Sequence, residues 1–226
     1  MGNLYIVATP IGNLEDITFR AVSTLRQVDL IFCEDTRVTR KLTANFDIET
    51  SAESLNARTE NKKIDRVLEV LKDGRNVALV TDAGTPAVSD PGAQLVAKVR
   101  EQLPEVKIQP IPGPSSLTAA LSVAGLPVSE FLFLGFLPHK KGRETLFQEI
   151  SESKRTVVIY ESPHRLIKTL KKLSDILDST YKVVVLRELT KYFEEIVGGS
   201  PEEVLLTFSE RENIKGEIIL MIGGRK

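Results

Sequence analysis

The amino-acid sequence predicts an α/β protein made of two α/β domains. Strand-like and helix-like segments alternate along the 226 residues, and this alternation favours sheets whose strands are connected by helices. Hydrophobic residues make up 42% of the chain, which suffices for a core and excludes a disordered chain. The longest apolar runs have the length of a strand, so no segment is expected to span a membrane.

In the first half, four apolar runs are each followed by a loop and a helix-like segment. Strands are expected at residues 4–8, 29–33, 77–80 and 106–109, and helices near Asp16, over 36–46, over 64–71 and from Asp90-Pro91. Ile64, Val67, Leu68 and Leu71 have amphipathic helical spacing, and Gly74 suits the end of that helix. Asp16 and Asp90 are expected to cap helices, with Pro91 in the first turn.

Three prolines in five residues, Pro110-Ile111-Pro112-Gly113-Pro114, are expected to stop the strand before them. They predict a boundary between domains 1–112 and 113–226. In the second domain, strands are expected at 131–134, 156–160, 182–186 and 217–222, and helices at 142–150, from Ser162-Pro163 and from Ser200-Pro201. The helix after Pro163 should turn Leu166, Ile167, Leu170 and Leu173 inward, and Ser200 with Glu203 forms a capping-box pattern.

The formal net charge is −1, but the charge is unevenly distributed. Residues 138–172 contain nine Lys/Arg and four Glu, whereas residues 187–212 contain seven Glu and three basic residues. Such runs are most often solvated helix surfaces. The basic run is also compatible with a nucleic-acid-binding face.

Other features bound the class of protein. The start Met1-Gly2-Asn3 lacks the basic residues and long apolar core of a signal peptide. A single cysteine, Cys33, excludes an internal disulfide, and two histidines make a metal site unexpected. The prediction is a cytoplasmic protein without membrane segment or metal.

The residues that directly follow the predicted strands are the candidates for a binding site, because α/β sheets bind ligands beyond the carboxyl ends of their strands. These loops combine Gly, Pro, hydroxyl groups and a few acids, as in TPIGN, EDTR, TDAGTPAVSDPG, PGPSS, YESPHR and RELTK. That composition suits a small polar ligand such as a nucleoside. Ordinary turn chemistry explains each single loop equally well. The dinucleotide, P-loop and nucleophile-elbow glycine motifs are absent.

Six blocks in order resemble one family. LYIVATPIGNLEDITFRAVSTLRQVDLIFCEDTRVTRKL, VALVTDAGTPAVSDPG, IPGPSSLTAALSVAGLP, FLFLGFLPHKKGR, YESPHRL and RELTK are similar to ribosomal RNA small subunit methyltransferase I, of the tetrapyrrole methylase superfamily. The resemblance implies two α/β domains with S-adenosylmethionine in the cleft between them, usually in a homodimer. It implies methyl transfer to the ribose 2′-hydroxyl of cytidine 1402 in the 16S RNA of the small (30S) subunit.

The resemblance also assigns roles to residues. The cofactor-binding set is Pro10, Ile11, Asp82, Thr85, Val88, Ser115, Ser116, Tyr160 and Leu189. The resemblance does not name the groups that carry out the chemistry: Glu34, Asp35 and Glu161 are candidates as acids at strand ends, together with Arg37. Lys140, Lys141, Arg165 and Lys191 are candidates for RNA phosphate contacts because of their charge, and Arg37 is a candidate for both roles. The competing interpretation of the acids is ion pairing with nearby bases, in the pairs Asp35–Arg37, Glu161–Arg165 and Glu188–Lys191.

Some features depart from the family pattern, and alternatives stay open. The stretch SAESLNARTE at 51–60 lacks the Tyr and His usual there, Thr81 is commonly Ser, and many members extend beyond the position of Lys226. One alternative is a tetrapyrrole C-methyltransferase acting on a porphyrinogen or precorrin. The other is a non-catalytic nucleotide- or RNA-binding module.

Overall fold

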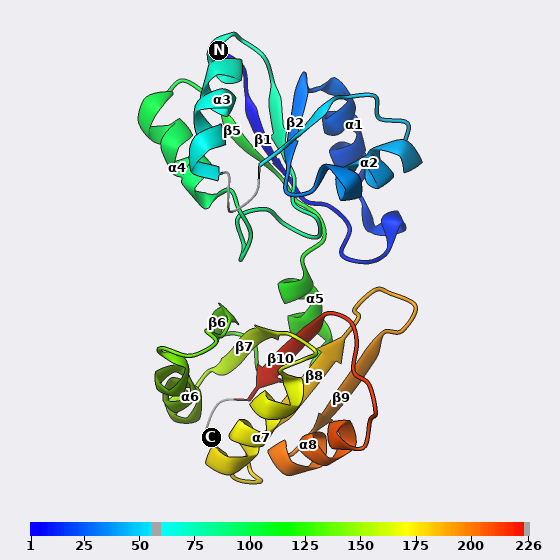
Figure 1. Cartoon of the computed structure of the whole chain (residues 1–226), viewed down its shortest axis with the longest axis vertical. Helices are drawn as coiled ribbons and strands as arrows, with labels where there is room; N and C mark the ends of the chain where they lie inside the picture. The colour runs from blue at the N-terminus through cyan, green and yellow to red at the C-terminus, as the bar shows by residue number, and fades with distance from the viewer. Residues whose placement is uncertain (56–59, 224–226) are drawn as a thin grey trace. The chain divides into compact units, whose positions relative to one another are not determined.

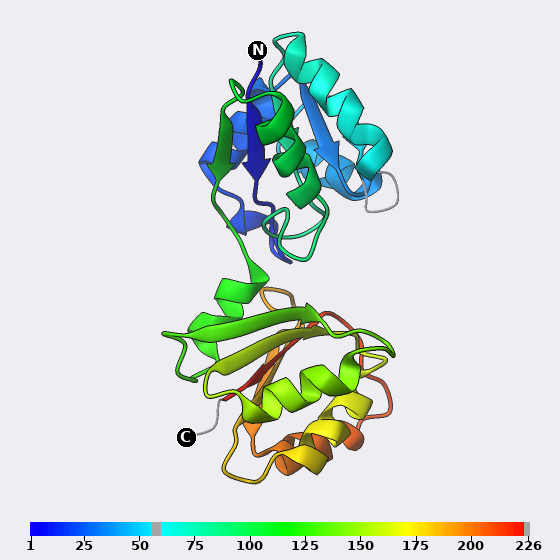
Figure 2. The same cartoon turned by 90° about the vertical axis from the view of Figure 1, so that its left-hand side faces the viewer.

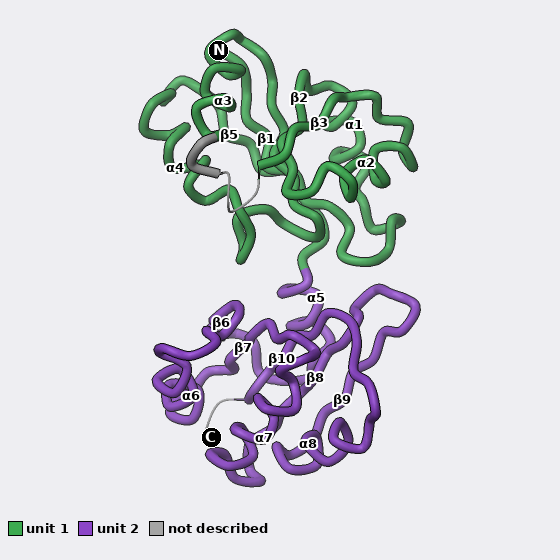
Figure 3. The backbone as a smooth tube through the Cα atoms, viewed as in Figure 1, with its two compact units in different colours: residues 1–115 green, residues 116–226 purple. Residues whose placement is uncertain are grey.

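The computed structural model describes residues 1–55 and 60–223 and forms two compact units, residues 1–115 and 116–226 (Figure 3). Residues 56–59, within the departing stretch noted above, and residues 224–226 lie outside this description. The two sheets and their helices confirm the predicted α/β class.

Unit 1 is a parallel five-stranded sheet covered by helices on both faces (Figure 1). The sheet contains strands β1 (Leu4–Val7), β2 (Leu30–Cys33), β3 (Ala52–Ser54), β4 (Val77–Leu79) and β5 (Ile108–Ile111). Their order across the sheet is β3-β2-β4-β1-β5. Helices α3 (Glu60–Lys72) and α4 (Ala93–Gln102) cover one face, and α1 (Phe19–Gln27) and α2 (Thr36–Asn45) the other. Strand side chains alternate between faces: Leu4 packs with Leu68, whereas Val7 packs with Leu25.

The expectation that the prolines stop the fourth strand was wrong at Pro110. Strand β5 runs through Pro110 and pairs only with β1, where Pro110 lies opposite Ile6. Because β5 is at the edge of the sheet, a residue without an N–H can be accommodated on its unpaired side.

Two helix starts also differ from prediction. Helix α1 is capped by Thr18, whose hydroxyl accepts from the Ala21 N–H at 3.0 Å, while Asp16 ends a short 3-10 helix (Leu14–Asp16). Helix α4 begins after Gly92, so Asp90 lies in the preceding loop. Its carboxyl is instead hydrogen-bonded to Thr81, a long-range contact that a capping rule does not anticipate.

Unit 2 is a mixed sheet with three helices on one face and one on the other (Figure 2). The sheet contains strands β6 (Phe131–Phe136), β7 (Thr156–Glu161), β8 (Val183–Arg187), β9 (Glu195–Gly199) and β10 (Ile218–Ile222). Their order across the sheet is β6-β7-β10-β8-β9. Among these neighbouring strands, β6 and β7 pair in parallel and the other pairs are antiparallel. Helices α6 (Arg143–Glu152), α7 (Leu166–Ile176) and α8 (Pro201–Ser209) cover the larger core, and α5 (Ser116–Val123) packs on the opposite face.

Two of the predicted helix starts in unit 2 had different outcomes. Helix α7 begins at Leu166 rather than after Pro163, and Ile167 is exposed while Leu166, Leu170 and Leu173 are buried. Helix α8 confirms the capping box: the Ser200 hydroxyl accepts from the Glu203 N–H at 3.3 Å, and the Glu203 carboxylate accepts from the Ser200 N–H at 2.8 Å.

Replacing Ser200 by Ala should lower the free energy of unfolding of unit 2 by about 1 kcal/mol, because one N-terminal N–H of α8 loses its acceptor. Tyrosine fluorescence during urea unfolding measures this, since three of the four tyrosines are in unit 2 and the chain has no Trp. Ser200→Asp, which restores an acceptor, should stay close to wild type. Equal losses in both variants would contradict the capping role.

Candidate active site

Beyond the carboxyl ends of β1 and β4, the two following loops are hydrogen-bonded to each other. The Thr9 N–H donates to the Gly84 carbonyl at 2.9 Å, and the Gly84 N–H donates to the Thr9 carbonyl at 3.0 Å. The Thr9 hydroxyl donates to the Thr81 carbonyl at 3.0 Å. The loops are therefore fixed in register at the edge where an α/β sheet binds its ligand.

A third loop, after β5, joins this edge at Gly84. Gly84 has φ +86°, and a Cβ there would lie 3.3 Å from Ile11 Cγ2 and 3.8 Å from the Pro114 carbonyl oxygen. The Thr85 hydroxyl donates to the same carbonyl at 3.1 Å. The structure thus brings together the predicted cofactor residues Ile11 and Thr85 and the backbone just before Ser115.

Three further predicted cofactor residues of unit 1 belong to the same three loops. Pro10 is buried, and Val88 and Ser115 are half-buried. Val88 lies in a loop with unusual backbone, since its neighbours Ala87 and Ser89 have φ +68° and +64°. Non-glycine residues in this region carry strain that is concentrated at functional sites.

Acids from the loops after β2 and β4 meet around Thr81. Asp82 accepts the Asp35 N–H at 3.0 Å, and the Thr81 hydroxyl donates to the Glu34 carboxylate at 3.1 Å. Asp90 also hydrogen-bonds Thr81. Burial first, and then the negative charge of Glu34, raises the pKa of Asp90 to about 6. Burial also raises the pKa of Asp82.

Asp35 has a different environment from its neighbour Glu34. Its carboxylate caps α2 by accepting the Arg37 N–H at 2.8 Å, and it pairs with the Arg37 guanidinium at 2.5 Å. The Arg37 hydrogen bonds lower the pKa of Asp35 to about 2. The predicted ion pair is confirmed, and a carboxylate this acidic is a poor proton acceptor at neutral pH.

In unit 2, the predicted residues Ser116, Tyr160 and Leu189 gather on the face of the sheet covered by α5. The Ser116 and Tyr160 hydroxyl oxygens are 2.9 Å apart. The Tyr160 ring makes edge contacts with Phe133 and Phe136 at centroid distances of 5.0 and 5.4 Å. Leu189 packs against the same apolar cluster as Tyr160.

Glu161, the other predicted acid, is fully enclosed. One carboxylate oxygen accepts from the Ser162 N–H at 2.8 Å and pairs with Arg165 at 2.7 Å. The other accepts from the Thr169 hydroxyl and faces Arg143 at 3.5 Å. Its side chain is 0% exposed, so the contacts favour the ion-pair interpretation, and we do not retain Glu161 as a proton acceptor.

The four basic residues predicted to contact RNA differ in whether they form ion pairs. Lys140 and Lys141 are exposed. Arg165 pairs with Glu161, and Lys191 pairs with Glu188 at 2.9 Å and Glu217 at 3.1 Å. The Glu161–Arg165 and Glu188–Lys191 ion pairs are therefore confirmed.

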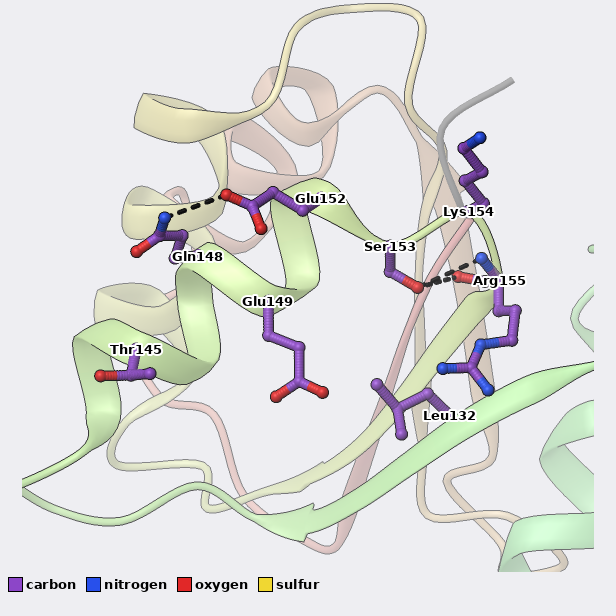
Figure 4. Close-up of a pocket in the computed structure, with 8 residues that line it drawn as sticks. All are labelled: Leu132, Thr145, Gln148, Glu149, Glu152, Ser153, Lys154 and Arg155. Atoms are coloured by element: carbon purple, nitrogen blue, oxygen red, sulfur yellow. Dashed lines mark hydrogen bonds between the residues drawn. The ribbon is translucent and has the colours of Figure 1, made fainter.

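Three further observations delimit the site. A pocket in unit 2 is lined by residues of β6, α6 and the segment after α6, none of them among the predicted residues: Leu132, Thr145, Gln148, Glu149, Glu152, Ser153, Lys154 and Arg155 (Figure 4). Among the described residues, His, Cys, Asp and Glu form no group suited to a metal ion. Within the same residues, no helix has the length and apolarity to cross a bilayer.

Sequence reasoning missed two residues at these places. The sequence pattern predicts Asp90 as a helix cap, and the signal that identifies it as a site residue is its position in a loop with Gly84 and Gly92, where the backbone folds back easily. Arg143 was counted only as part of a basic run; it is 7% exposed. The available signal for its burial is the position of Arg143, which lies two residues after Lys141 at the start of a helix with an apolar face.

The class of protein follows from comparison with known families. The profile of the Tetrapyrrole (Corrin/Porphyrin) Methylases matches residues 3–205, and the chain belongs to this family. Structures of family members agree at the level of fold. The cobalt precorrin-4 methyltransferase CbiF is 21% identical, with a TM-score of 0.71 over 98% of this chain and 94% of that one. Uroporphyrin-III C-methyltransferase from Thermus thermophilus, complexed with S-adenosylhomocysteine, is 18% identical, with a TM-score of 0.68 over 98% of this chain and 97% of that one.

More similar relatives have one name, ribosomal RNA small subunit methyltransferase I. The protein of that name from Thermotoga maritima is 44% identical over 100% of both chains. The one from Vibrio cholerae is 46% identical over 98% of this chain and 77% of its own length. The resemblance of the sequence motifs to this group is confirmed.

Gly84→Val should abolish binding of S-adenosylmethionine, because a branched side chain at φ +86° would displace Ile11 and the Pro114 carbonyl. Titration calorimetry measures the affinity. Gly74→Val is the matched control: Gly74 has φ +82° but no atom within 4 Å of its added Cβ, so it imposes similar backbone strain without closing the loops. Unchanged affinity in Gly84→Val, or an equal loss in both variants, would place the cofactor elsewhere.

Proposed function

We propose that the protein transfers a methyl group from S-adenosylmethionine to the ribose 2′-hydroxyl of cytidine 1402 in the 16S RNA of the small ribosomal subunit. The observation that carries this proposal is the similarity, at 44–46% identity over nearly the whole chain, to enzymes named for that RNA. The structures named for tetrapyrrole substrates are only 18–21% identical, which makes a tetrapyrrole C-methyltransferase the second candidate.

The loops of unit 1 fit the cofactor. A side chain at Gly84 would fill the space beside Ile11, so the bare backbone there allows a ligand to approach closely. Ile11 and Pro10 would contact apolar parts of the cofactor, and Thr85 and Asp82 would hold the loop. When bound, S-adenosylmethionine supplies an electrophilic methyl group on a sulfonium.

The protein's own task is then to orient the ribose and accept its proton. Orientation of two reactants accounts for roughly 7–11 kcal/mol of barrier lowering in favourable cases. Burial and the negative charge of Glu34 raise the pKa of Asp90 to about 6, which suits a proton acceptor at physiological pH. Glu34 shares the Thr81 hydroxyl with it and completes the acidic site.

Two further properties belong to this proposal. An enzyme acting on ribosomal RNA without a membrane-spanning helix among its described residues would work in the cytoplasm. We also expect a homodimer, on the basis of the family resemblance, and sedimentation equilibrium of the full chain tests it.

The test of the activity is methyl transfer from labelled S-adenosylmethionine to 30S subunits that lack the modification, with mapping of the methylated nucleotide. Label at the cytidine ribose supports the proposal. Label on a porphyrinogen and none on RNA would establish the tetrapyrrole alternative, and cofactor binding without turnover on either would indicate a non-catalytic module.

Asp90→Asn should lower the single-turnover methylation rate by about 10²–10⁴-fold while leaving cofactor affinity intact. In the wild type, Asp90 accepts a proton only when ionised, so the rate should rise with pH through about 6 and then level off. The pH profile of the rate, measured with saturating RNA, tests both statements. A wild-type profile that is flat across pH 5–7 would exclude Asp90 as the acceptor.

Asp35→Asn is the matched control for the same measurement. Asn also caps helices, so helix α2 should stay intact, and loss of a carboxylate that is already paired with Arg37 should change the rate little. Glu34, one of the candidates from the sequence, is separated from Asp90 by Glu34→Gln: a loss larger than that of Asp90→Asn would assign the role to Glu34.

A further inference from the structure

The enclosed carboxylate of Glu161 connects two loops of unit 2. Arg143, at the start of α6, and Arg165, just before α7, both contact it. Their other nitrogens reach the loop after β6: Arg165 donates to the Leu137 carbonyl at 2.9 Å, and Arg143 donates to the Pro138 carbonyl at 3.3 Å. The two arginines thus bind the backbone that leads directly into residues 139–142.

Further contacts hold the two arginines, and both are largely buried. Arg143 also donates to the Thr169 hydroxyl at 2.7 Å, and its guanidinium lies 5.1 Å from the centre of the Phe147 ring. The side chains of Arg143 and Arg165 are 9% and 17% exposed. Two guanidiniums share one carboxylate, so the interior keeps a net positive charge beneath the loop, and buried charges are weakly screened by salt.

The loop held in this way presents only basic side chains. His139, Lys140 and Lys141 are exposed, and His164 and Lys168 are exposed on the neighbouring start of α7. No ion pair joins any of these five to an acid among the described residues. Lys172, further along α7, is by contrast neutralised by Glu144 at 2.6 Å.

We propose that the five residues His139, Lys140, Lys141, His164 and Lys168 form a phosphate-binding platform for the substrate RNA, with Arg143, Glu161 and Arg165 as the residues that position it. The inference rests on the proposed function for the identity of the RNA. A backbone of regularly spaced phosphates is the partner that fits three exposed lysines beside two histidines able to donate hydrogen bonds, since such contacts position a strand without reading its sequence.

The first experiment removes surface charge. Lys140→Ala with Lys141→Ala should weaken binding of an RNA hairpin copied from the 30S decoding region on the order of tenfold, and lower the slope of log affinity against log salt by about 1.4–1.8. Fluorescence anisotropy over a salt series measures both. Lys154→Ala with Arg155→Ala is the control: it removes the same charge beyond the other end of α6, which at ten residues is about 15 Å long.

The second experiment tests the positioning residues. Arg143→Met changes none of the five platform residues but removes the hydrogen bond to the Pro138 carbonyl that holds their loop. KM for RNA should rise about three- to tenfold with kcat and cofactor affinity unchanged, hydrogen exchange of the 139–142 amides should increase, and Arg143→Lys should recover part of the RNA affinity. A general structural role would change cofactor affinity and kcat as well.

The platform is refuted if the Lys140/Lys141 double variant keeps the wild-type salt slope, or if the control variant loses as much affinity. Both outcomes leave methylation by the wild type intact, so they are distinct from failure of the proposed function. If the wild type methylates no ribosomal RNA, the platform is still judged by hairpin binding alone.

Discussion

The pairing of Thr9 with Gly84 is the interaction on which the candidate active site depends. It extends the contact between β1 and β4 past the ends of both strands. The position of the loop after β4 is therefore fixed relative to the loop after β1. Gly84 suits that point because its φ is +86° and an added Cβ would lie 3.3 Å from Ile11 Cγ2, which is a tight contact. With the loop fixed, Asp82 meets the Asp35 N–H, and Thr81 meets Glu34. One backbone bridge therefore sets the positions of groups from four strand ends.

Local rules predicted the parts of this structure that depend on neighbours in sequence. The Ser200 capping box and the Asp35–Arg37 pair join residues two or three positions apart, and both are present. Long-range contacts decided the rest. Pro110 is tolerated because the topology places β5 at an edge. Strands β3 and β9 were not predicted, because β3 has only three residues and β9 ends in two glycines, which leaves little pattern to detect.

Two acids at strand ends show why a sequence pattern names candidate residues without assigning their chemistry. Glu34 and Glu161 both end or follow a buried strand, and the sequence pattern makes both of them candidates. Helix α6 brings Arg143 against Glu161 from 18 residues away, and that carboxylate becomes enclosed and paired. Among the described residues no ion pair to Glu34 is present, and its neighbours around Thr81 are other acids. The difference lies in which helix packs behind each strand, and a local sequence pattern does not contain that.

Asp35 in the β2 loop and Asp90 in the β4 loop change the stability of the fold in opposite directions as the pH rises. Asp35 has a pKa lowered to about 2, so its contribution stabilises the fold above the ordinary carboxyl pKa and is lost as the pH falls toward 2. Asp90 has a pKa raised to about 6, so folding favours its protonated form, and its contribution to stability declines as the pH rises from about 4 to 6. At neutral pH Asp90 is therefore ionised, and its ionised form lowers the stability of the fold. Two carboxyls whose pKa values are driven apart by one site are the arrangement expected of separate structural and proton-accepting roles.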